Sequence, residues 1–498
     1  MKKHFLPVVL PAICVILSAL IILSCIAQCR RAIDSEVVVF SSSADGDRLK
    51  RTKGNPFITD RDLPLPVITV DTAVRFQKID GFGASFNEAG MICLNSLSRE
   101  SKDSVLRMLF DKESGAGFSL MKSPIGACDF ASAGPWYTYN EVSGDTAMNH
   151  FSIERDLRPD GLVTFIKEAM KYGEFQIESP MDFAPDWMYF GLKDGEKHIR
   201  PEYYSALAKY YSKYIQAYAG NGVTINYLNL FNEPDHPHYS NVTYQEIGHI
   251  IKDYVVPRFK ADGISTRIQL GETCVRGEAL EKFPAILSDP EIRNHIHAVT
   301  VHGYDWKDFA KLTEFHNKFP DIPVWMTEIC YATMCCIPEN GPAKVPVYEF
   351  SDGEFWGNMI MNDLKNYVSG WIYWNMILDQ NGGPWLVSPE HGDPDNNPQH
   401  SVVIINRAAG KVTYTGLYYY LAHFSRFIRP GAYRINSSGG IDKLNFAAFR
   451  NTDGTIVLNV INNSDEIKCK IKWYNKMTTQ KFKAHSITTI IWNQEDGL

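Results

Sequence analysis

Tyr227-Leu228-Asn229-Leu230-Phe231-Asn232-Glu233-Pro234 is an apolar run that ends at a carboxylate and a proline. The apolar residues predict a buried strand, and Pro234 predicts its end, because proline has no backbone N–H to give to a β-ladder. Glu233 is therefore expected at a strand tip, with the amide of Asn232 beside it. The run Val324-Trp325-Met326-Thr327-Glu328-Ile329 repeats this design, so a second glutamate is expected at the end of a second strand.

These two runs belong to a longer alternation of strand and helix patterns, which starts near Ile79 and occurs eight times. The clearest helical pattern is an apolar stripe from Tyr203 to Tyr218, which we interpret as packing surface. Eight such units in roughly 330 residues predict an α/β fold, a (β/α)8 TIM barrel. The predicted strands are Lys78–Phe86, Phe118–Gly126, Phe175–Met181, Ile225–Glu233, Arg267–Thr273, Ile296–Tyr304, Val324–Ile329 and Gly370–Leu378.

The C-terminal part has a different pattern, with short alternating runs separated by turn signals. It predicts a small antiparallel β-sandwich attached to the barrel, completed by the early run Val67–Phe76. The predicted strands are Leu444–Phe449, Thr455–Ile461, Ile467–Trp473 and Ser486–Trp492. The expected organisation is a signal segment at 1–29, a linker at 30–66, the first sandwich strand at 67–78, the barrel at 79–428 and the remaining sandwich at 429–498.

The N-terminus has the pattern of a targeting segment, because two lysines precede an apolar run from Phe5 to Leu23. Ile22-Leu23-Ser24-Cys25 resembles a bacterial lipoprotein cleavage box, in which Cys25 becomes the lipid-carrying first residue. The alternative is an uncleaved anchor, since the run is close to the ~20 apolar residues that span a bilayer. Both readings predict export to the bacterial periplasm or cell surface, with membrane contact only through this N-terminal lipid or anchor.

Composition excludes some classes of partner. The 498 residues have a net charge of −7 and no long basic run, which argues against nucleic acid. A hydrophobic content of 45% is typical of a globular protein with a large core. The cysteines beyond the leader follow no disulfide framework, and none is paired with other cysteines or histidines at metal-ligand spacing. We therefore predict neither a metal nor another cofactor.

A barrel places its functional residues at the C-terminal ends of its strands. Taken alone, Asn-Glu-Pro is more often a strand-to-helix turn in which the acid stabilises a helix N-terminus. Glutamates at the fourth and seventh strand ends, however, are expected to face each other across the barrel mouth, as glycoside hydrolysis requires. The predicted strand tips carry acids, amides and rings, namely Asp129, Asn232, Glu233, His302, Tyr304, Glu328, Trp374 and Asn375.

This pair predicts a double displacement, because carboxyl groups about 5–5.5 Å apart leave no room for an inverting water. Glu328, ionised, is expected to attack the anomeric carbon. Glu233, protonated, is expected to donate to the departing oxygen and then to activate water. That role requires a raised pKa of Glu233, which a second carboxylate and aromatic walls would supply. Asn232 is expected to bind the sugar 2-hydroxyl, and His302 and Tyr304 are expected to orient the nucleophile.

Several motifs occur together in one order along the chain. They are Ile79-Asp80-Gly81-Phe82-Gly83-Ala84-Ser85-Phe86, Pro124–Phe130, Tyr137-Thr138-Tyr139, Asn232-Glu233-Pro234, Thr327-Glu328, Trp374–Pro384 and His423–Gly431. In this order they resemble the motifs of glycoside hydrolase family 30, which contains glucosylceramidases, β-1,6-glucanases and related β-xylosidases. The resemblance runs from about Ile79 to Trp492. It implies the same barrel with a side sandwich built from both ends of the chain.

The resemblance also implies site residues. Asp129 matches the family position that binds sugar hydroxyls, and Glu233 and Glu328 match the acid/base and the nucleophile. Lys122 stands where the family usually has arginine, which replaces a planar fork by a point charge. Met181 stands where a stacking tryptophan is usual, so that wall is either missing or supplied by Trp187. The loop from Ile329 to Pro346, rich in cysteine and proline, is particular to this chain. The predicted substrate-binding residues are Asp129, Asn232, His302, Tyr304, Trp374, Asn375, Lys122 and Trp187.

These observations predict an exported retaining β-glycosidase that acts on a carbohydrate or glycolipid, cutting β-glucosidic linkages as glucosylceramidases or β-1,6-glucanases do. One alternative is a β-xylosidase or β-fucosidase of the same fold. A second alternative, from a different class, is a surface glycan-binding lipoprotein with weak turnover, which the residues at Lys122 and Met181 favour. The retention of both Glu233 and Glu328 argues against a binder, which has no need of two facing acids.

Overall fold

The computed structural model describes residues 37–131, 136–190, 198–234, 241–331, 349–384 and 398–493. The predicted leader with its lipidation site at Cys25 lies outside these ranges, as does most of the loop that follows Glu328. Within the described ranges, none of the helices combines the length and apolar character that crossing a bilayer requires. The cysteines described, Cys93, Cys128, Cys274, Cys330 and Cys469, form no disulfide bonds with one another.

Eight parallel strands close into a barrel, which confirms the predicted fold. Each strand pairs with its neighbours in the order β10-β11-β12-β13-β14-β5-β6-β7 around the ring. All eight lie within or next to the predicted runs. The strands are β5 (Gly81–Ser85), β6 (Leu120–Lys122), β7 (Gln176–Ser179), β10 (Tyr227–Leu228), β11 (Arg267–Thr273), β12 (Ile296–His302), β13 (Val324–Glu328) and β14 (Val368–Asn375).

The interior of the barrel is filled by side chains. Leu120, Tyr227, Ala298, Trp325 and Ile372 form a buried cluster of their own, separate from the larger core outside the strands. A Cβ atom placed on Gly370 would lie 2.8 Å from the Trp325 ring, so the glycine makes room for that indole. The cluster closes the interior below the strand ends, as expected for a packed barrel.

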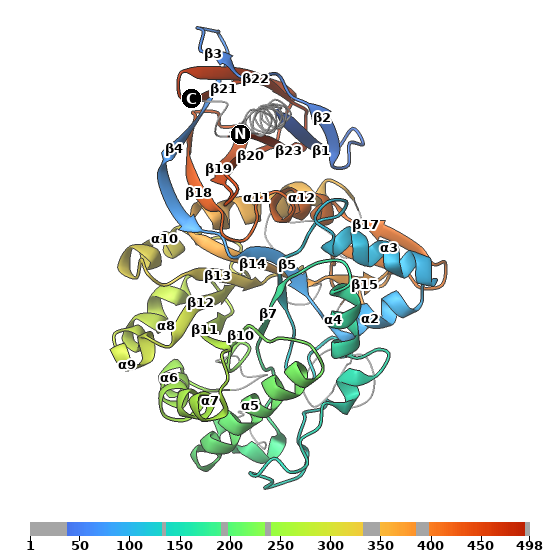
Figure 1. Cartoon of the computed structure of the whole chain (residues 1–498), viewed down its shortest axis with the longest axis vertical. Helices are drawn as coiled ribbons and strands as arrows, with labels where there is room; N and C mark the ends of the chain where they lie inside the picture. The colour runs from blue at the N-terminus through green and yellow to red at the C-terminus, as the bar shows by residue number, and fades with distance from the viewer. Residues whose placement is uncertain are drawn as a thin grey trace, which may run out of the picture.

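Helices cover the outside of the barrel (Figure 1). The predicted tyrosine stripe lies on α5 (Tyr204–Gly220), where Tyr210, Tyr211, Tyr214 and Tyr218 are fully buried, so the stripe is packing surface as predicted. The other helices are α2 (Glu88–Asn95), α3 (Arg99–Phe110), α4 (Leu162–Ala169), α6 (Tyr244–Ile250), α7 (Val256–Asp262), α8 (Glu278–Leu287), α9 (Pro290–Arg293), α10 (Phe309–Lys318), α11 (Asp352–Lys365) and α12 (Gly416–Ser425). Small additions are β8 (Tyr189–Phe190), β9 (His198–Ile199), β15 (Ile377–Asp379), β16 (Val403–Asn406) and β17 (Lys411–Tyr414).

A ten-stranded sheet forms the second domain, in which the first and last described strands lie side by side (Figure 1). Its pairing is antiparallel as predicted, with one correction: β4 runs parallel to β21, from Val67 beside Lys470 to Val70 beside Trp473. The strands are β1 (Val38–Ser43), β2 (Lys50–Lys53), β3 (Ile58–Thr59), β4 (Val67–Lys78), β18 (Tyr433–Ser438), β19 (Leu444–Arg450), β20 (Thr455–Asn462), β21 (Ile467–Trp473), β22 (Lys476–Phe482) and β23 (Ser486–Asn493).

The segment 30–66 was expected to be a linker, and for its described part that expectation is wrong. It contributes β1, β2 and β3 to the sandwich sheet. The apolar run Val37-Val38-Val39-Phe40 starts β1, which pairs along its whole length with β23. Val37 and Val39 are buried in the sandwich core. The surrounding polar residues obscured a short strand whose inward side chains are apolar.

The barrel and the sandwich are joined through buried polar contacts as well as apolar packing. His423, on α12, is fully buried between the two domains. One ring nitrogen lies 2.7 Å from the Thr489 hydroxyl of β23 and the other 3.0 Å from the Ser42 hydroxyl of β1. Burial, with a smaller effect of Arg426, lowers the pKa of His423 to about 3.

We expect this junction to weaken in acid. The unfolded chain binds a proton at His423 below its ordinary pKa of about 6.5, whereas the folded chain binds it only near pH 3. Stability is therefore complete above pH 6.5 and falls by about 1.4 kcal/mol per pH unit between these values. His423→Gln, which keeps a donor and an acceptor, should remove this contribution. Urea unfolding of the wild type and of His423→Gln from pH 7 to pH 4 tests this. A difference in the free energy of unfolding that stays constant across that range would contradict it.

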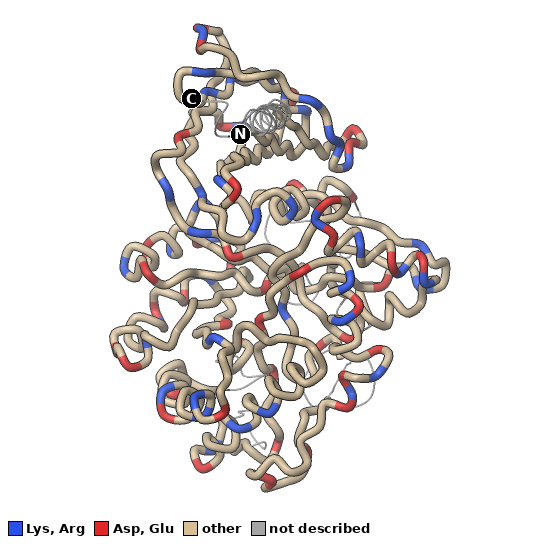
Figure 2. The backbone as a smooth tube through the Cα atoms, viewed as in Figure 1, with Lys and Arg blue, Asp and Glu red and all other residues tan. Residues whose placement is uncertain are grey.

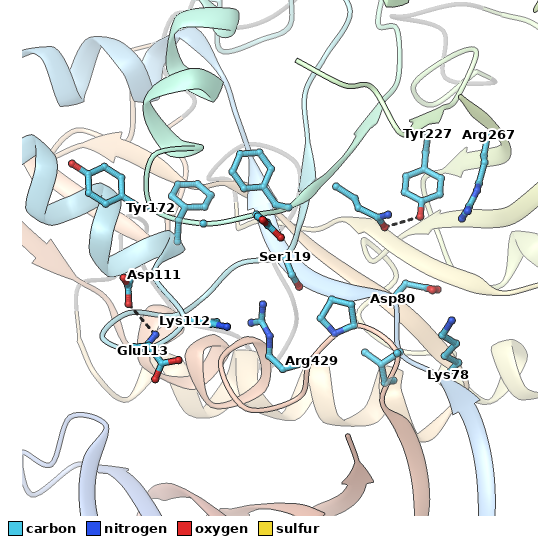
Figure 3. Close-up of a pocket in the computed structure, with 18 residues that line it drawn as sticks. Lys78, Asp80, Asp111, Lys112, Glu113, Ser119, Tyr172, Tyr227, Arg267 and Arg429 are labelled. Carbon is cyan, nitrogen blue, oxygen red and sulfur yellow. Dashed lines mark hydrogen bonds between the residues drawn. The ribbon is translucent and has the colours of Figure 1, made fainter. Parts of the chain in front are cut away.

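A cavity of about 1080 Å³ opens at the N-terminal ends of the barrel strands (Figure 3). Asp80 and Ser119 precede β5 and β6, and Tyr227 and Arg267 begin β10 and β11. Arg429, at the passage into the sandwich, lines the same cavity and donates to the carbonyl of Gly117 at 2.6 Å. Functional residues of such barrels lie at the opposite strand ends. We therefore interpret this cavity as part of the joint between the domains.

Candidate active site

Glu233 and Glu328 meet at the C-terminal ends of the barrel strands. Glu233 follows β10, Glu328 ends β13, and both side chains are largely buried, with 7% of each residue exposed. One carboxylate oxygen of each lies within 4.8 Å of the other, and a ring nitrogen of His302 lies within the same distance of both. The chain thus brings together two acids that are far apart in sequence.

The backbone around Glu233 explains how this acid is held. β10 is shorter than the predicted strand, because after Leu228 the chain leaves the regular ladder and bonds to its neighbours at intervals. The backbone N–H of Asn232 donates to the carbonyl of Met181 at 2.8 Å, and the backbone N–H of Glu233 donates to the backbone carbonyl of Glu272 at 3.0 Å. Glu233 adopts a φ of +41°, a left-handed conformation that is uncommon for a residue with a side chain.

Both oxygens of Glu328 receive hydrogen bonds. The Tyr304 hydroxyl donates to Oε1 at 2.9 Å, and the Lys122 ammonium donates to Oε2 at 2.9 Å. An ionised carboxylate is an acceptor only, so two donors, one of them charged, suit the ionised form of Glu328. Tyr304 therefore lies where a residue that orients the nucleophile was expected.

Lys122 is the cation of the site, and it is almost completely buried. Its ammonium also lies 2.6 Å from Oε2 of Glu272, 3.3 Å from Oδ1 of Asn232 and 5.4 Å from the centre of the Trp374 ring. Burial acts to lower the pKa of Lys122, but the charges of Glu272 and Glu328 outweigh it and raise the pKa well above its ordinary value. A lysine in place of the expected arginine thus still supplies a permanent positive charge.

Replacing Lys122 with methionine should destabilise the fold, because it leaves the carboxylates of Glu272 and Glu328 buried without their cation. Removing one member of a buried ion pair costs about 3–5 kcal/mol. Lys171→Met is the matched control, because Lys171 pairs with Glu168 on the exposed surface of α4. Surface changes of that kind stay within about ±0.5 kcal/mol. Chemical denaturation measures the free energy of unfolding of both variants. Equal losses of that free energy would contradict the stabilising role of Lys122.

His302, at the end of β12, is fully buried between carboxylates. Nδ1 lies 2.8 Å from Oε1 of Glu233, and Nε2 lies 3.1 Å from Oε2 of Glu272. The nucleophile is farther away, with Oε1 of Glu328 3.9 Å from Nδ1. Burial acts to lower the pKa of His302, but Glu328 and Glu272 raise it to about 10. His302 was expected to orient Glu328, whereas the structure places it most closely against Glu233.

Glu272 was not among the predicted site residues. It lies near the end of β11, is fully buried and has a φ of +60°. The signal was present in the sequence, because the predicted strand Arg267–Thr273 carries this glutamate near its tip. The rule that selected Glu233 and Glu328 selects Glu272 when it is applied to the fifth strand.

A second missed acid, Asp182, follows the unusual Met181. Met181 is fully buried, so its side chain does not take the place of a stacking tryptophan. Asp182 is 3% exposed. Burial raises the pKa of Asp182 well above its ordinary value, against the lowering effect of Lys122. Next to it in sequence, Phe183 meets the ring of Trp136 edge to face, with the ring centres 4.7 Å apart.

The remaining predicted contacts divide into two groups. Trp374 is buried beside Lys122, and Asp129 is partly exposed next to Phe130, whose ring lies 6.5 Å from that of Trp374. These positions leave their predicted roles open to test. Trp187 packs its ring edge on Tyr203 at 5.0 Å and donates its indole N–H to the carbonyl of Asn140, so its stacking role also stays a prediction.

Asn375 differs from its expectation. Its side chain is fully buried, its amide NH2 donates to Gln399 at 2.6 Å, and its carbonyl oxygen accepts from Asn87 at 3.1 Å. Because both ends of the amide are used within the protein, Asn375 supports the wall of the site and is not placed to bind a sugar. The strand-tip rule found the position of Asn375, but it could not show that its hydrogen-bond partners are other side chains of the protein.

The spacing of Glu233, His302 and Glu328 is also that of a possible cation site. The Lys122 ammonium already neutralises Glu328 at 2.9 Å, and His302 is held by carboxylates at both ring nitrogens. A divalent ion there would have to displace these charges. We therefore keep the prediction that the chemistry of this site uses no metal.

An eight-stranded parallel barrel with two facing acids at its C-terminal ends is an arrangement suited to glycoside hydrolysis. Comparison with known proteins specifies the family. Residues 79–428 match the glycosyl hydrolase family 30 TIM-barrel domain, and residues 431–490 match the family 30 beta sandwich domain. The chain belongs to glycosyl hydrolase family 30 and is a glycosidase of that family.

Relatives in sequence and structure agree with this assignment. Endo-1,6-beta-D-glucanase BGN16.3 of Trichoderma harzianum is 31% identical over 409 residues, which cover 76% of each chain. Lysosomal acid glucosylceramidase of Mus musculus is 26% identical over 429 residues, covering 80% of this chain and 78% of that protein. SrfJ from Salmonella typhimurium has the same fold, with a TM-score of 0.82 at 22% identity over 92% of this chain and 100% of that one. The endo-beta1,6-glucanase BT3312 has a TM-score of 0.80 at 23% identity, over 92% and 99% of the two chains.

Proposed function

We propose that the protein is a retaining β-glycosidase that hydrolyses β-D-glucosidic linkages by double displacement. One observation carries the proposal: an oxygen of Glu233 and an oxygen of Glu328 lie within 4.8 Å of each other. Retaining enzymes hold their carboxyl groups about 5–5.5 Å apart, whereas inverting enzymes need about 6.5–9.5 Å to admit a water. The short separation supports attack by a carboxylate.

The contacts of the two acids support distinct roles. Glu328, held by Tyr304 and Lys122, attacks the anomeric carbon, and the bond to the leaving oxygen breaks as Glu233 protonates that oxygen. Glu233 then takes a proton from water, which attacks the glycosyl ester and releases Glu328. In this mechanism Asn232, whose Oδ1 accepts from Lys122 at 3.3 Å, binds the sugar 2-hydroxyl.

The stereochemistry of the first product tests this mechanism. A retaining enzyme releases the β-anomer of the sugar first, and mutarotation to the α-anomer occurs only later. Proton NMR of the anomeric region in the first minutes of hydrolysis of an aryl β-glucoside distinguishes the two outcomes. Initial release of the α-anomer would show inversion and would exclude Glu328 as a covalent nucleophile.

The names of the relatives support a β-glucosyl unit as the sugar, because a glucosylceramidase and an endo-1,6-beta-D-glucanase share it. The two activities differ in the leaving group, which is a lipid in one case and a further sugar in the other. Incubation with glucosylceramide and with a β-1,6-glucan in parallel assigns the aglycone. Aryl β-xylosides and β-fucosides belong in the same assay, since preference for either would favour the alternative sugar. Cleavage of none of these substrates would support the glycan-binding alternative.

We also propose that the protein is exported and lipid-anchored at Cys25. The first described residues enter the sandwich, whose strands carry many blue Lys and Arg positions (Figure 2). Residues 37–78 and 429–493 together contain 17 Lys and Arg against 9 Asp and Glu, although the whole chain has a net charge of −7. A basic domain next to the anchor suits an anionic membrane surface. Labelled palmitate should be incorporated into the wild type and not into Cys25→Ala, and a wild type that stays in the membrane fraction without taking up the label would favour an uncleaved anchor.

A further inference from the structure

Glu272 takes part in none of the steps above, yet it lies at the centre of the contacts that connect the two reacting acids. Its carboxylate accepts hydrogen bonds from the Lys122 ammonium, from Nε2–H of His302 and from the Thr327 hydroxyl. The residue is fully buried and holds a left-handed backbone, an arrangement that costs energy and that persists only where the surroundings enforce it. Two of its partners, Lys122 and His302, each contact one of the two reacting glutamates.

The charges around His302 determine where its protons lie. Burial acts to raise the pKa of Glu272, but Lys122 and His302 outweigh it and lower that pKa below its ordinary value. Glu272 is therefore ionised and can only accept, so Nε2 of His302 carries a hydrogen. The groups that act on His302 are the carboxyls of Glu178, Glu233, Glu272 and Glu328, with the Tyr304 ring beside it and the Lys122 ammonium bound to Glu272. The groups that act on its partner Glu233 are the carboxyls of Asp182 and Glu278, the Cys274 thiol and the Tyr244 hydroxyl.

The contact between Nδ1 of His302 and Oε1 of Glu233, 2.8 Å long, then holds one proton. With the proton on Nδ1 the pair is imidazolium and carboxylate, and with the proton on Oε1 it is imidazole and carboxylic acid. The total charge is the same in both forms. The second form is the one that can donate to a leaving oxygen, so this pair stores the proton that the proposed reaction uses.

We propose, on the basis of the proposed function, that Glu272 is a positioning residue that fixes the tautomer of His302, retains the acid/base proton on the His302–Glu233 pair and holds Lys122 against Glu328. Its negative charge favours the protonated pair. When the pair loses its proton, Glu233 can no longer act as an acid. The alkaline limit of activity therefore reports on Glu272, although Glu272 contacts neither the sugar nor the bond that breaks.

Glu272→Gln tests this assignment, because it keeps the shape of the side chain and removes its charge. The alkaline limb of the kcat/KM profile should move to lower pH by about one unit or more, since loss of an adjacent anion weakens proton binding to the pair. The effect should lie in kcat, with KM little changed. Glu272→Asp, which restores the charge, should return the limb toward the wild-type position. Failure of aspartate to do so, while the protein remains folded, would overturn the assignment.

Glu178→Gln is the matched control. Glu178 is also fully buried inside the barrel, and its Oε1 accepts from Asn229 at 3.2 Å. Burial, followed by the charge of Glu272, raises the pKa of Glu178 well above its ordinary value, whereas the pKa of Glu272 is lowered, and Glu178 makes no hydrogen bond to His302 or Lys122 among the described contacts. The alkaline limb should stay in place in this variant. An equal shift in both variants would show a general effect of changing the barrel interior and would overturn the specific role of Glu272.

A second measurement does not depend on activity. In the full chain labelled with ¹⁵N-histidine, the His302 signals are assigned by their loss in His302→Gln. The wild-type ring should retain Nε2–H and titrate well above the ordinary histidine range, and Glu272→Gln should lower that midpoint. An unchanged midpoint would overturn the proposal even in an active enzyme. If instead no β-glycoside is cleaved, the proposed function fails, and the His302 titration still decides the role of Glu272.

Discussion

Replacing Glu328 with glutamine is expected to lower kcat by at least about 10⁴-fold, on natural and activated substrates alike. The amide keeps the size of the side chain and can still bond to Tyr304 and Lys122, so the site should stay assembled. It cannot, however, form the glycosyl ester. Because this step precedes every other, a better leaving group cannot compensate. Steady-state rates on an aryl β-glucoside and on a β-1,6-glucan measure the loss.

Glu168→Gln is a suitable control for this variant, because it is the same substitution at a residue on the surface of α4. Its kcat should equal that of the wild type. Thermal unfolding of both variants shows whether the fold is retained. If Glu328→Gln hydrolysed aryl glucosides at the rate of Glu168→Gln, Glu328 could not be the nucleophile.

Glu233→Ala is expected to separate substrates by their leaving groups. General acid catalysis contributes about 10²–10⁴-fold, so a sugar or lipid alkoxide should leave that much more slowly. A nitrophenolate leaves without a proton, and the first step should survive with it. Water attack then lacks its base, so the glycosyl ester at Glu328 should accumulate. Azide needs no base to attack, and it should restore turnover and give a β-glycosyl azide.

The comparison with Glu328→Gln makes the roles testable together. Azide should not give the β-glycosyl azide with Glu328→Gln. That product requires two displacements, and the first of them needs the Glu328 carboxylate. A burst of nitrophenol followed by slow turnover in Glu233→Ala would show the accumulated ester. Equal losses in both variants on every substrate, with no azide product from Glu233→Ala, would contradict the assignment of acid/base and nucleophile.

Much of the architecture could be predicted from local patterns. Repeated apolar runs, each followed by a helical period, require a parallel sheet with helices outside, and eight of them close a barrel. The proline after Glu233 and the apolar run before Glu328 then place both acids at strand ends. Chain distance is no obstacle to this inference, because the barrel brings all eight strand ends to one face.

Other parts could not be predicted because they depend on partners from distant strands. The run Val37–Phe40 becomes a strand only when β23, more than 440 residues later, offers its edge. Asn375 occupies a strand tip, but Asn87 and Gln399 take up its amide. Whether a polar side chain faces a substrate or another side chain depends on what lies opposite, and no pattern within one strand records that.

The sequence by itself determined that this chain forms a barrel with a side sandwich and that two glutamates stand at its rim, because periodicity and strand ends are local properties. Only the tertiary structure decided how Lys122, Glu272 and His302 divide charge and protons between those glutamates. Electrostatic interactions in a buried site depend on distances of a few ångströms between side chains from different strands. Those distances exist only after the barrel has closed.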